Sequence, residues 1–317
     1  MRRLRVIKGW KDVPAADRGA AVTNIGNFDG VHRGHQQVIA LAAKAAGALG
    51  VPLGVITFDL HPRAYFRPDE PAFRLMKPDQ QARALEALGV DILYVLPLTA
   101  ELAEMTDREF AAEVLHKGLD VRHVAIGFDN SFGKDRTGGP ETLQTYGREL
   151  GFGVSVAEPV ADREGEKFSS TSVREALREG HPEVAAQILG RPFAIEGAVQ
   201  RGRQLGRKLG FPTANVGLGD YVIPRFGVYA TRTRLPDGRE VPGVANVGVN
   251  PTIEGVRIPL LEVWLFDFDE DIYDQVIETD LIAFLRPEAK FDSLEIMTEQ
   301  VMKDAKAARD LLMPDFG

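Results

Sequence analysis

Residues 25–39 read IGNFDGVHRGHQQVI and connect an apolar segment to a helical one. The run AAVTNIGNF is typical of a buried strand, and HQQVIALAAKAAGAL has the composition and the periodic apolar positions of a helix. Glycines in the junction would let the backbone approach a ligand, and the N–H groups at the start of the helix suit a phosphate. His32 and His35 could donate hydrogen bonds to that phosphate. A buried and a turn-facing histidine beside a turn glycine are the alternative interpretation.

The alternation of strand and helix continues through residues 20–160. LGVITFD, DILYVLPL and VRHVAIGF are short apolar runs typical of buried strands, with helical segments between them. TDREFAAEVLHKGL begins with a capping box, Thr106 and Glu109, and continues as an amphipathic helix. This alternation predicts an α/β domain in which helices cover both faces of a parallel sheet.

The pattern changes after about residue 192. β-rich segments such as FAIEGAVQ, VYATRTRL and VIETDLIAFL follow one another without intervening helices, and LPDGR at 235–239 supplies hairpin-turn residues. We expect a small antiparallel β-barrel followed by one terminal α-helix. The apolar stripe expected on that helix is Leu294, Met297, Val301, Ala305, Ala308, Leu311 and Leu312. The boundary falls near residues 181–192, which predicts domains of 1–186 and 187–317.

Composition narrows the possible functions. A formal charge of −8 argues against a broad nucleic-acid or membrane surface and still permits a local basic pocket. The chain has no cysteine, which excludes disulfides, iron–sulfur clusters and thiolate zinc sites. No apolar run approaches a membrane span, and the basic start MRRLRVIKGWKDVP lacks the apolar core of a secretory signal. We therefore expect a cytoplasmic protein that uses neither nucleic acid nor membrane as a partner.

Four segments in the first half resemble one family. G-x-F-D-G-x-H-x-G-H is similar to the signature of the adenylyltransferase module in prokaryotic bifunctional riboflavin kinase/FMN adenylyltransferases, also called FAD synthetases. TFDLHPR at 57–63, IGFDNSFGKDRTG at 126–138 and FSSTSVREAL at 168–177 resemble further segments of that family, in order. Neither G-x-G-x-x-G nor the Walker pattern occurs. The resemblance implies a Rossmann-like nucleotidyltransferase domain.

The resemblance also implies roles for individual residues. His32 and His35 would be catalytic, and a flavin pocket would include Asp59, His61 and Pro62. The ATP and phosphate set would be Gly26, Phe28, Asp29, Gly34, Asp129, Ser169, Ser170, Thr171 and Arg174. The structural alternatives are a turn role for Asp29 and His61, a core role for Phe28, and N-caps for Ser169 and Thr171. This chain departs from the family pattern at Asp59, Leu60, Asn130 and Ser172, where Glu, Pro, Phe and Arg are usual.

A second motif set lies in the barrel half. GAVQRGRQLGRKLGFPTAN at 197–215 combines basic residues and glycines with a Pro-Thr-Ala-Asn element. By itself the basic run is typical of a solvated loop, but FPTAN resembles the riboflavin kinase signature. The resemblance implies that Thr213 and Asn215 help hold Mg²⁺, whose preferred ligands are oxygens. The implied ATP and phosphate set is Gly202, Gly206, Lys208, Gly210, Thr213 and Asn215.

LEVWLFDFDEDIY at 261–273 resembles the kinase segment that carries a glutamate, with Trp264 in place of the usual histidine. We expect Glu262 to be the general base for a riboflavin hydroxyl. Strand alternation would bury Leu261, Val263 and Leu265 and turn Glu262 and Trp264 to the other face. The acidic run 267–271 is interpreted as a solvated turn rather than a metal site. Arg286 would contact flavin or phosphate, or else pair with Glu288.

Together the two halves predict an enzyme of FAD biosynthesis. The C-terminal domain would phosphorylate riboflavin with ATP and Mg²⁺ to give FMN, and the N-terminal domain would adenylylate FMN to FAD with release of pyrophosphate. The small-molecule partners would be riboflavin, FMN and ATP, and the sequence leaves the oligomeric state open. The first alternative is a monofunctional riboflavin kinase with a degenerate, regulatory N-terminal domain. A nucleotidyltransferase for another acceptor and a non-catalytic flavin-storage protein are the others.

Overall fold

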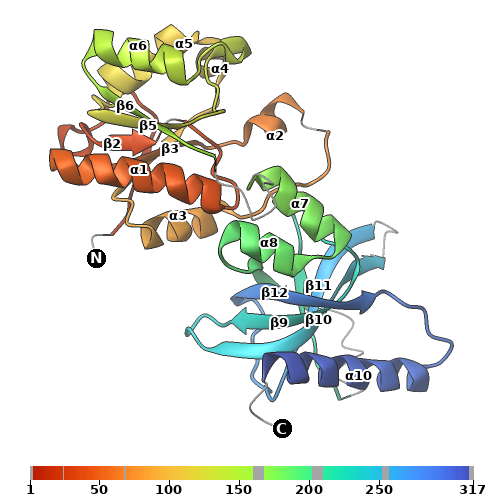
Figure 1. Ribbon diagram of the computed structural model, residues 1–317. Coiled ribbons are helices and arrows are strands. Elements are labelled where there is room, and N and C mark those ends of the chain that lie inside the picture. Colours follow the sequence, from red (N-terminus) through yellow and green to blue (C-terminus); the bar gives the residue numbers. More distant parts are fainter. Residues whose placement is uncertain are drawn as a thin grey trace. The chain divides into compact units, whose positions relative to one another are not determined.

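The computed structural model describes residues 3–23, 25–67, 69–159, 168–201, 210–251 and 257–313. These residues form two compact units (Figure 1). Unit 1 comprises Met1–Pro71 and Pro78–Phe168, and unit 2 comprises Ala72–Lys77 and Ser169–Gly317.

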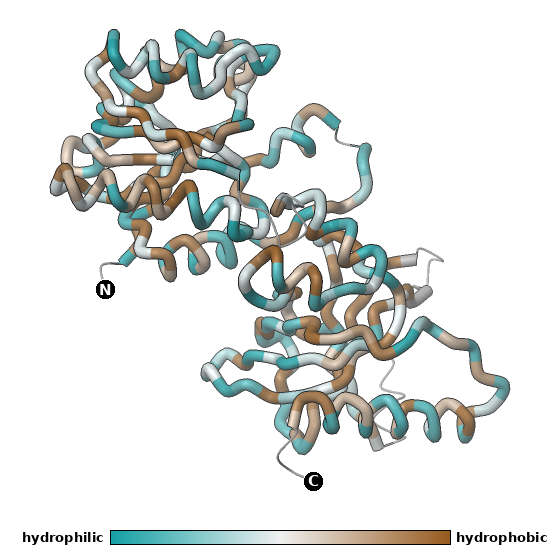
Figure 2. Tube along the Cα trace, in the orientation of Figure 1, coloured by the Kyte–Doolittle hydropathy of each residue, from teal (hydrophilic) through white to brown (hydrophobic). Residues whose placement is uncertain are grey.

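Unit 1 is built on a six-stranded sheet with the order β1-β4-β3-β2-β5-β6, in which every pair of neighbours is parallel. Most strand residues are apolar (Figure 2), and β2, β3, β4 and β5 are largely buried. A parallel sheet buried on both faces accounts for these continuous apolar runs. The strands are β1 Arg5–Lys8, β2 Ala21–Thr23, β3 Leu53–Phe58, β4 Ile92–Leu96, β5 His123–Gly127 and β6 Gly153–Ala157.

Helices cover both faces of this sheet: α1 and α3 lie on one side and α4, α5 and α6 on the other (Figure 1). The capping box of Thr106 and Glu109 is confirmed, and it starts α5, which continues into a π-helical stretch, η2. The α-helices are α1 Arg33–Leu49, α2 Pro62–Phe66, α3 Pro78–Ala87, α4 Ala100–Glu104, α5 Asp107–Glu109 and α6 Pro140–Leu150. Stretch η2 spans Phe110–Gly118, and short 3₁₀ turns are η1 Ala15–Asp17 and η3 Lys134–Arg136. The predicted α/β architecture is confirmed.

Unit 2 contains a closed six-stranded barrel with the order β10-β11-β8-β7-β12-β9 and antiparallel pairing throughout. Its interior is filled by side chains such as Ile195, Leu261, Val263, Ile277 and Thr279, all at most 1% exposed. The strands are β7 Phe193–Gln200, β8 Ala214–Gly217, β9 Gly227–Arg234, β10 Glu240–Pro251, β11 Arg257–Leu265 and β12 Val276–Pro287. A filled interior leaves the outer wall and the rims of the barrel for a substrate.

The terminal helix α10, Leu294–Leu312, packs on the outside of the barrel. Ala305, Ala308 and Leu312 contact a patch that includes Val228 and Val244. The predicted apolar stripe is wrong at Leu294 and Leu311, which are 50% and 45% exposed. The buried contact with the barrel wall is made by the C-terminal half of the helix, and helical spacing alone does not reveal how far that contact extends.

Two helices and one short segment complete unit 2. Helices α7 Ser170–Glu179 and α8 Pro182–Leu189 pack on each other, and α8 also packs on β7 and β12. The segment Ala72–Lys77 joins the unit because the Arg74 amide donates to the Asp220 carbonyl over 2.9 Å and the Val222 amide donates to the Arg74 carbonyl over 2.8 Å. The sequence patterns predict neither this segment nor the short strand β1. Across the described ranges, no helix has the length and apolar character needed to span a membrane.

Candidate active sites

The H-x-G-H junction lies where the strand order of the parallel sheet reverses. β2 and β5 are neighbours, and the chain proceeds from β2 through β3 to β4 on one side and from β5 to β6 on the other. The loops that follow β2 and β5 are joined because the Asn130 side-chain amide donates to the Ile25 carbonyl over 3.4 Å. Ligands of open parallel sheets bind beyond the strand ends at such a point. The topology of unit 1 therefore favours this junction as the nucleotide site.

The two histidines form a stacked pair at the start of α1. His32 is the N-cap of the helix, and its Nδ1 accepts a hydrogen bond from the His35 backbone N–H over 3.4 Å, so Nε2 carries the proton of the neutral ring. The ring centroids are 3.6 Å apart. Burial, together with His32, holds the pKa of His35 well below 6.5, which makes this ring neutral at pH 7. His35 Nδ1 is buried without a hydrogen-bond partner among the described residues.

The backbone around the pair is tightly constrained. A Cβ on Gly34 would lie 3.0 Å from His32 Cε1 and 3.2 Å from the Phe168 carbonyl oxygen, so glycine leaves space for the His32 ring. Phe28 has a φ of +47° and is 3% exposed, and its ring centroid lies 4.9 Å from that of His35. Asp29 is also buried, and the Gly26 amide donates to the Ile56 carbonyl over 3.1 Å. Phe28 thus contributes to the core and supports the His35 ring.

The TFDLHPR element caps local structure. Asp59 Oδ1 accepts from the backbone amides of Leu60 and Leu98 at 2.6 and 2.9 Å, which ties the ends of β3 and β4 together. His61 is the N-cap of α2, where its Nδ1 accepts from the Arg63 amide over 3.1 Å, and Pro62 occupies the first turn. The turn role considered for His61 is therefore present in the structure.

The FSSTSVREAL element begins α7 in unit 2. Ser169 is the N-cap; its Oγ accepts from the Ser172 amide over 3.1 Å and lies 2.9 Å from Ser172 Oγ. Ser172, which stands where the family has arginine, thus takes part in the cap. Arg174 is buried, and its Nε donates to the Phe73 carbonyl over 2.7 Å. Ser170 is half-buried, and Thr171 and, in unit 1, Asp129 are exposed.

Unit 2 contains a cavity of about 190 Å³ at the barrel. Thr213 and Asn215 both line it, so the structure brings these two predicted ligands together. The remaining lining residues are Val199, Pro212, Ala214, Val263, Leu265 and the run from Phe268 to Tyr273. Gly210, with a φ of +89°, precedes this segment. Gly202, Gly206 and Lys208 lie outside the described residues.

Glu262 lies beside Asn215 through strand pairing. It is directly opposite Asn215 of β8 and, on its other side, opposite Asn246 of β10. Directly opposed residues on antiparallel strands share a face, with Cβ atoms about 5 Å apart. The predicted alternation is confirmed, because Leu261, Val263 and Leu265 are buried whereas Glu262 and Trp264 are half-buried. Glu262 is not among the cavity-lining residues and lies one strand away from Asn215 on the outer face.

Arg286 has a different ion-pair partner from the one considered from the sequence. Its Nε and Nη2 donate to the carboxylate of Asp304 on α10 at 2.7–3.0 Å. Glu288 instead accepts from Asn246 over 3.5 Å. The pairing of β12 with α10 through Asp304 is invisible in the sequence because it joins residues 18 positions apart on different elements.

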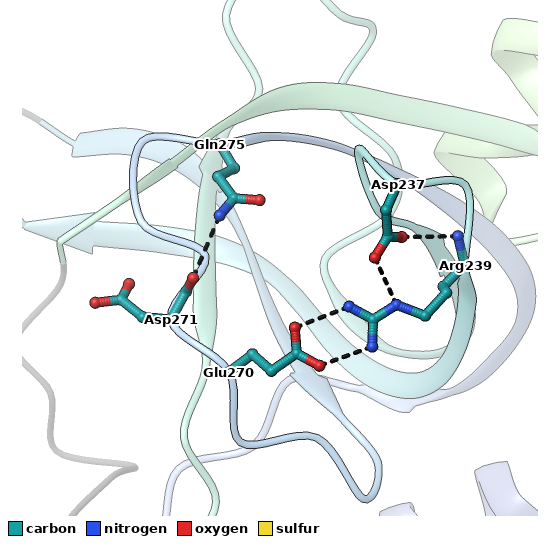
Figure 3. Close-up of polar contacts among 5 residues, drawn as sticks. All are labelled: Asp237, Arg239, Glu270, Asp271 and Gln275. Carbon is teal, nitrogen blue, oxygen red and sulfur yellow. Dashed lines mark hydrogen bonds and ion pairs between the residues drawn. The ribbon is translucent and has the colours of Figure 1, made fainter.

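The acidic run contributes a cavity wall. Glu270 and Asp271 line the cavity, and Glu270 is bound by Arg239 of the hairpin between β9 and β10 (Figure 3). Asp267 is bound by Arg309 of α10. The described residues contain no cluster of three or more histidine, aspartate or glutamate side chains arranged for a metal. Sequence reasoning missed Arg239, whose only local signal is its place after the Asp-Gly turn.

Comparison with known proteins relates both halves of the chain to enzymes. The family model described as FAD synthetase matches residues 14–172, and the model described as riboflavin kinase matches residues 189–312. A bifunctional riboflavin kinase/FMN adenylyltransferase of Pseudomonas fluorescens is 40% identical over 98% of this chain and 99% of its own length. The protein of that name from Escherichia coli K12 is 36% identical over 97% of each chain.

The chain belongs to the bifunctional riboflavin kinase/FMN adenylyltransferase family. It acts in FAD biosynthesis through both activities, phosphorylation of riboflavin to FMN and adenylylation of FMN to FAD. The monofunctional alternative is not favoured, because both family models match and the curated relatives are named as bifunctional.

A solved structure has the same architecture as this family member. The crystal structure described as a macrolide-efflux protein from Streptococcus pneumoniae matches with a TM-score of 0.86 at 32% identity, covering 97% of this chain and 99% of that one. Since the match spans both units, the parallel sheet and the closed barrel occur together in that protein as well.

Proposed function

We propose that the two reactions take place at separate sites, one in the N-terminal part of the chain and one in the C-terminal barrel. The observation that carries this proposal is the distribution of the two motif sets: H-x-G-H follows the central strand of the parallel sheet, whereas Thr213, Asn215 and Glu262 lie on or next to adjacent barrel strands. Adenylyl transfer is assigned to residues 1–186 and riboflavin phosphorylation to residues 187–317. The substrates are riboflavin, FMN and ATP, and the use of ATP supports a cytoplasmic location.

At the first site His32 and His35 bind the phosphate groups that react. The helix N-terminus supplies partial positive charge, and the neutral His35 ring supplies polar atoms without a desolvated cation. Donors held in place before reaction stabilise the negative charge that develops when the FMN phosphate attacks the α-phosphorus of ATP and pyrophosphate leaves. The cap formed by His61 holds the neighbouring flavin segment of unit 1 in a fixed conformation.

At the second site Glu262 accepts the proton of the riboflavin 5′-hydroxyl as that oxygen attacks the γ-phosphorus of ATP and ADP leaves. A positioned carboxylate typically contributes about 10²–10⁴-fold to such a step. Its place between Asn215 and Asn246 supports this role, because the two amides can orient the carboxylate or the substrate. Arg286 remains a predicted flavin contact, now with Asp304 as the residue that fixes its guanidinium.

The oxygen atoms of Thr213 and Asn215 fit a nucleotide-bound Mg²⁺. Both residues line one cavity, and a hydroxyl and an amide carbonyl are hard oxygen donors, which this ion prefers. Two protein oxygens suffice because Mg²⁺ in such sites keeps several ligands from water and substrate phosphates. When bound, the ion neutralises charge on the ATP phosphates.

Incubation with riboflavin, ATP and Mg²⁺, followed by chromatographic separation of the flavins, tests the proposal. We expect FMN to appear first and FAD to follow. Fragments 187–317 and 169–317 should make FMN and no FAD; the longer one keeps α7 and α8, which pack with the barrel. FAD formation by either fragment, or a folded fragment that makes no FMN, would contradict the assignment.

A further inference from the structure

The loop between β11 and β12 forms one wall of the barrel cavity. Its residues from Phe268 to Tyr273 all line the cavity, and the loop also contains Asp267 and Asp274. This segment, residues 267–274, is called the acidic loop below. Uncompensated carboxylates would repel a substrate that carries phosphates, so their partners and their positions matter for binding.

Arg239 holds the middle of the acidic loop with a two-pronged ion pair. Its Nη1 and Nη2 donate to the two carboxylate oxygens of Glu270 at 2.7 and 2.8 Å (Figure 3). A bidentate pair of this kind fixes the direction as well as the distance of the carboxylate. These hydrogen bonds hold the pKa of Glu270 below its usual value, so the loop carries this charge in compensated form.

The Arg239 side chain is also fixed by Asp237 of its own hairpin. Asp237 Oδ2 accepts from Arg239 Nε over 2.6 Å, and Asp237 Oδ1 accepts from the Arg239 backbone amide over 2.9 Å (Figure 3). The turn is closed by the hydrogen bond from the Leu235 amide to the Arg239 carbonyl, with Gly238 at a φ of +87°. The guanidinium therefore extends from a short, ordered hairpin toward the cavity wall.

The ends of the acidic loop have anchors of their own. Arg309 donates two hydrogen bonds to Asp267 at 2.7 and 3.0 Å, and the Arg201 guanidinium lies 4.5 Å from the Tyr273 ring centroid. Within the loop the Gln275 side chain donates to the Asp271 carbonyl over 3.3 Å (Figure 3). Arg239 thus acts on the central part of the wall, between two anchored ends.

We propose that Arg239 is a positioning residue for the riboflavin kinase reaction, which acts through Glu270 to fix the cavity wall. The inference rests on the proposed location of the kinase site at this cavity. Arg239 does not line the cavity, and a wall contacts bound substrate equally before and during phosphoryl transfer. Loss of the pair should therefore raise KM and leave kcat unchanged.

The test measures the KM values for ATP and riboflavin and the kcat of FMN formation in full-length Arg239→Gln and Glu270→Gln. Because the pair is about half exposed, we expect the KM of at least one substrate to rise about three- to fivefold, with kcat within about twofold. The difference from wild type should shrink at about 0.5 M salt, which screens the exposed pair. Arg239→Lys, which keeps a positive charge between Asp237 and Glu270 but loses the two-pronged geometry, should show a smaller rise in KM than Arg239→Gln.

The matched control is Arg234→Gln, which removes another half-exposed arginine ion pair from the same hairpin, with Glu240 and Glu278, away from the cavity-lining residues. Unchanged KM values in Arg239→Gln, or an equal rise in the control, would overturn the proposal. Asn215→Ala separates this failure from failure of the proposed site. If Asn215→Ala loses FMN formation and Arg239→Gln is normal, only the positioning role is wrong; if Asn215→Ala is fully active, the cavity is not the kinase site.

Discussion

The two proposed sites are built from different parts of the backbone. In unit 1 the sheet is open and parallel, and the histidines lie at the start of α1, beyond a central strand and at the reversal of the strand order. In unit 2 the sheet is closed and its interior is filled, so Glu262 and Asn215 lie on the outer face and beside a cavity formed with a loop. In the open sheet the strand order determines where the proposed site lies. In the closed barrel its position depends on which residues are paired across strands and on loop contacts.

The electrostatic character of the two sites differs in the same way. The His32–His35 pair is neutral at His35, closely packed and placed at a helix N-terminus. The wall of the barrel cavity is acidic, and arginines from other elements compensate Asp267 and Glu270. The proposed first site thus offers fixed dipoles, and the proposed second site offers charges whose positions depend on ion pairs.

The largest expected effect is the loss of riboflavin phosphorylation with conversion of FMN to FAD intact. Glu262→Gln should reduce FMN formation by about 10²–10⁴-fold, because the amide keeps the size of the side chain and removes its basicity. Conversion of supplied FMN to FAD should proceed at the wild-type rate. Each half-reaction is measured separately by chromatography of the flavins.

Glu240→Gln, at an exposed carboxylate on β10, is the matched control and should leave both reactions unchanged. Near-normal phosphorylation by Glu262→Gln would mean that another group is the base, and Asp269 and Asp271 of the acidic loop would be tested next.

The next effect concerns the histidine pair. His32→Ala and His35→Ala should each slow FAD formation by about 10²-fold, by analogy with the loss of an oxyanion donor, without slowing FMN formation. His32→Asn keeps an acceptor at the N-cap and should fold with near wild-type stability. If His32→Asn also restores the full rate of FAD formation, His32 serves as a cap only.

A smaller effect is expected from crowding the same pair. In Gly34→Ala the new methyl group would lie 3.0 Å from His32 Cε1, so the ring must shift, and we expect about a tenfold loss of FAD formation with normal FMN formation. The control is Gly47→Ala in the same helix, where a Cβ meets nothing within 4 Å. That change should stabilise the helix by about 1 kcal/mol and leave activity intact. Full activity of Gly34→Ala would show that the His32 position is not critical.

The smallest expected effect is a change in how the stability of unit 2 depends on pH. Burial and the neighbouring Glu278 raise the pKa of Asp280 from 3.8 to about 6 in the folded barrel. Ionisation of Asp280 therefore opposes folding: the stability it contributes when protonated is lost as pH rises from about 4 through 6. Asp280→Asn should stabilise unit 2 by about 1–2 kcal/mol at pH 8, with no gain near pH 4, in denaturant titrations.

Asp292→Asn, at an exposed aspartate of the same unit, is the matched control. The stability of unit 1 depends on pH in the opposite direction at His35. Its lowered pKa contributes stability above pH 6.5, and this stability is lost as the pH falls. If Asp280→Asn raised the free energy of unfolding equally at pH 4 and pH 8, the raised pKa of Asp280 would be contradicted.

Much of this comparison could be predicted from local sequence. Buried strands, the Thr106 capping box and the turn at 235–239 are indicated by apolar runs and residue preferences. His32, His35, Thr213 and Asn215 stand in short motifs, and the structure brings each pair together. Glu262 could be assigned to the half-buried face of its strand because side chains alternate with a period of two.

The remaining features depend on contacts that no local pattern encodes. Ala72–Lys77 joins unit 2 through backbone hydrogen bonds with residues near Tyr221, which carry no side-chain signal. Arg239 and Asp304 take their partners from distant elements, so their charges look like ordinary surface charges in the sequence. The exposed Leu294 at the start of the α10 stripe shows the same limit, since amphipathic spacing does not reveal how much of a helix packs against a partner.

If each unit catalyses one half-reaction at its own site, two inactive variants should complement each other, and a mixing experiment tests this. Full-length Glu262→Gln and His32→Ala are each given riboflavin, ATP and Mg²⁺, alone and as an equimolar mixture, and the flavins are separated over time. We predict little FMN or FAD from the first variant, accumulation of FMN with little FAD from the second, and FAD after an FMN intermediate from the mixture. Failure of the mixture to make FAD, or loss of both half-reactions in either variant, would contradict two independent sites.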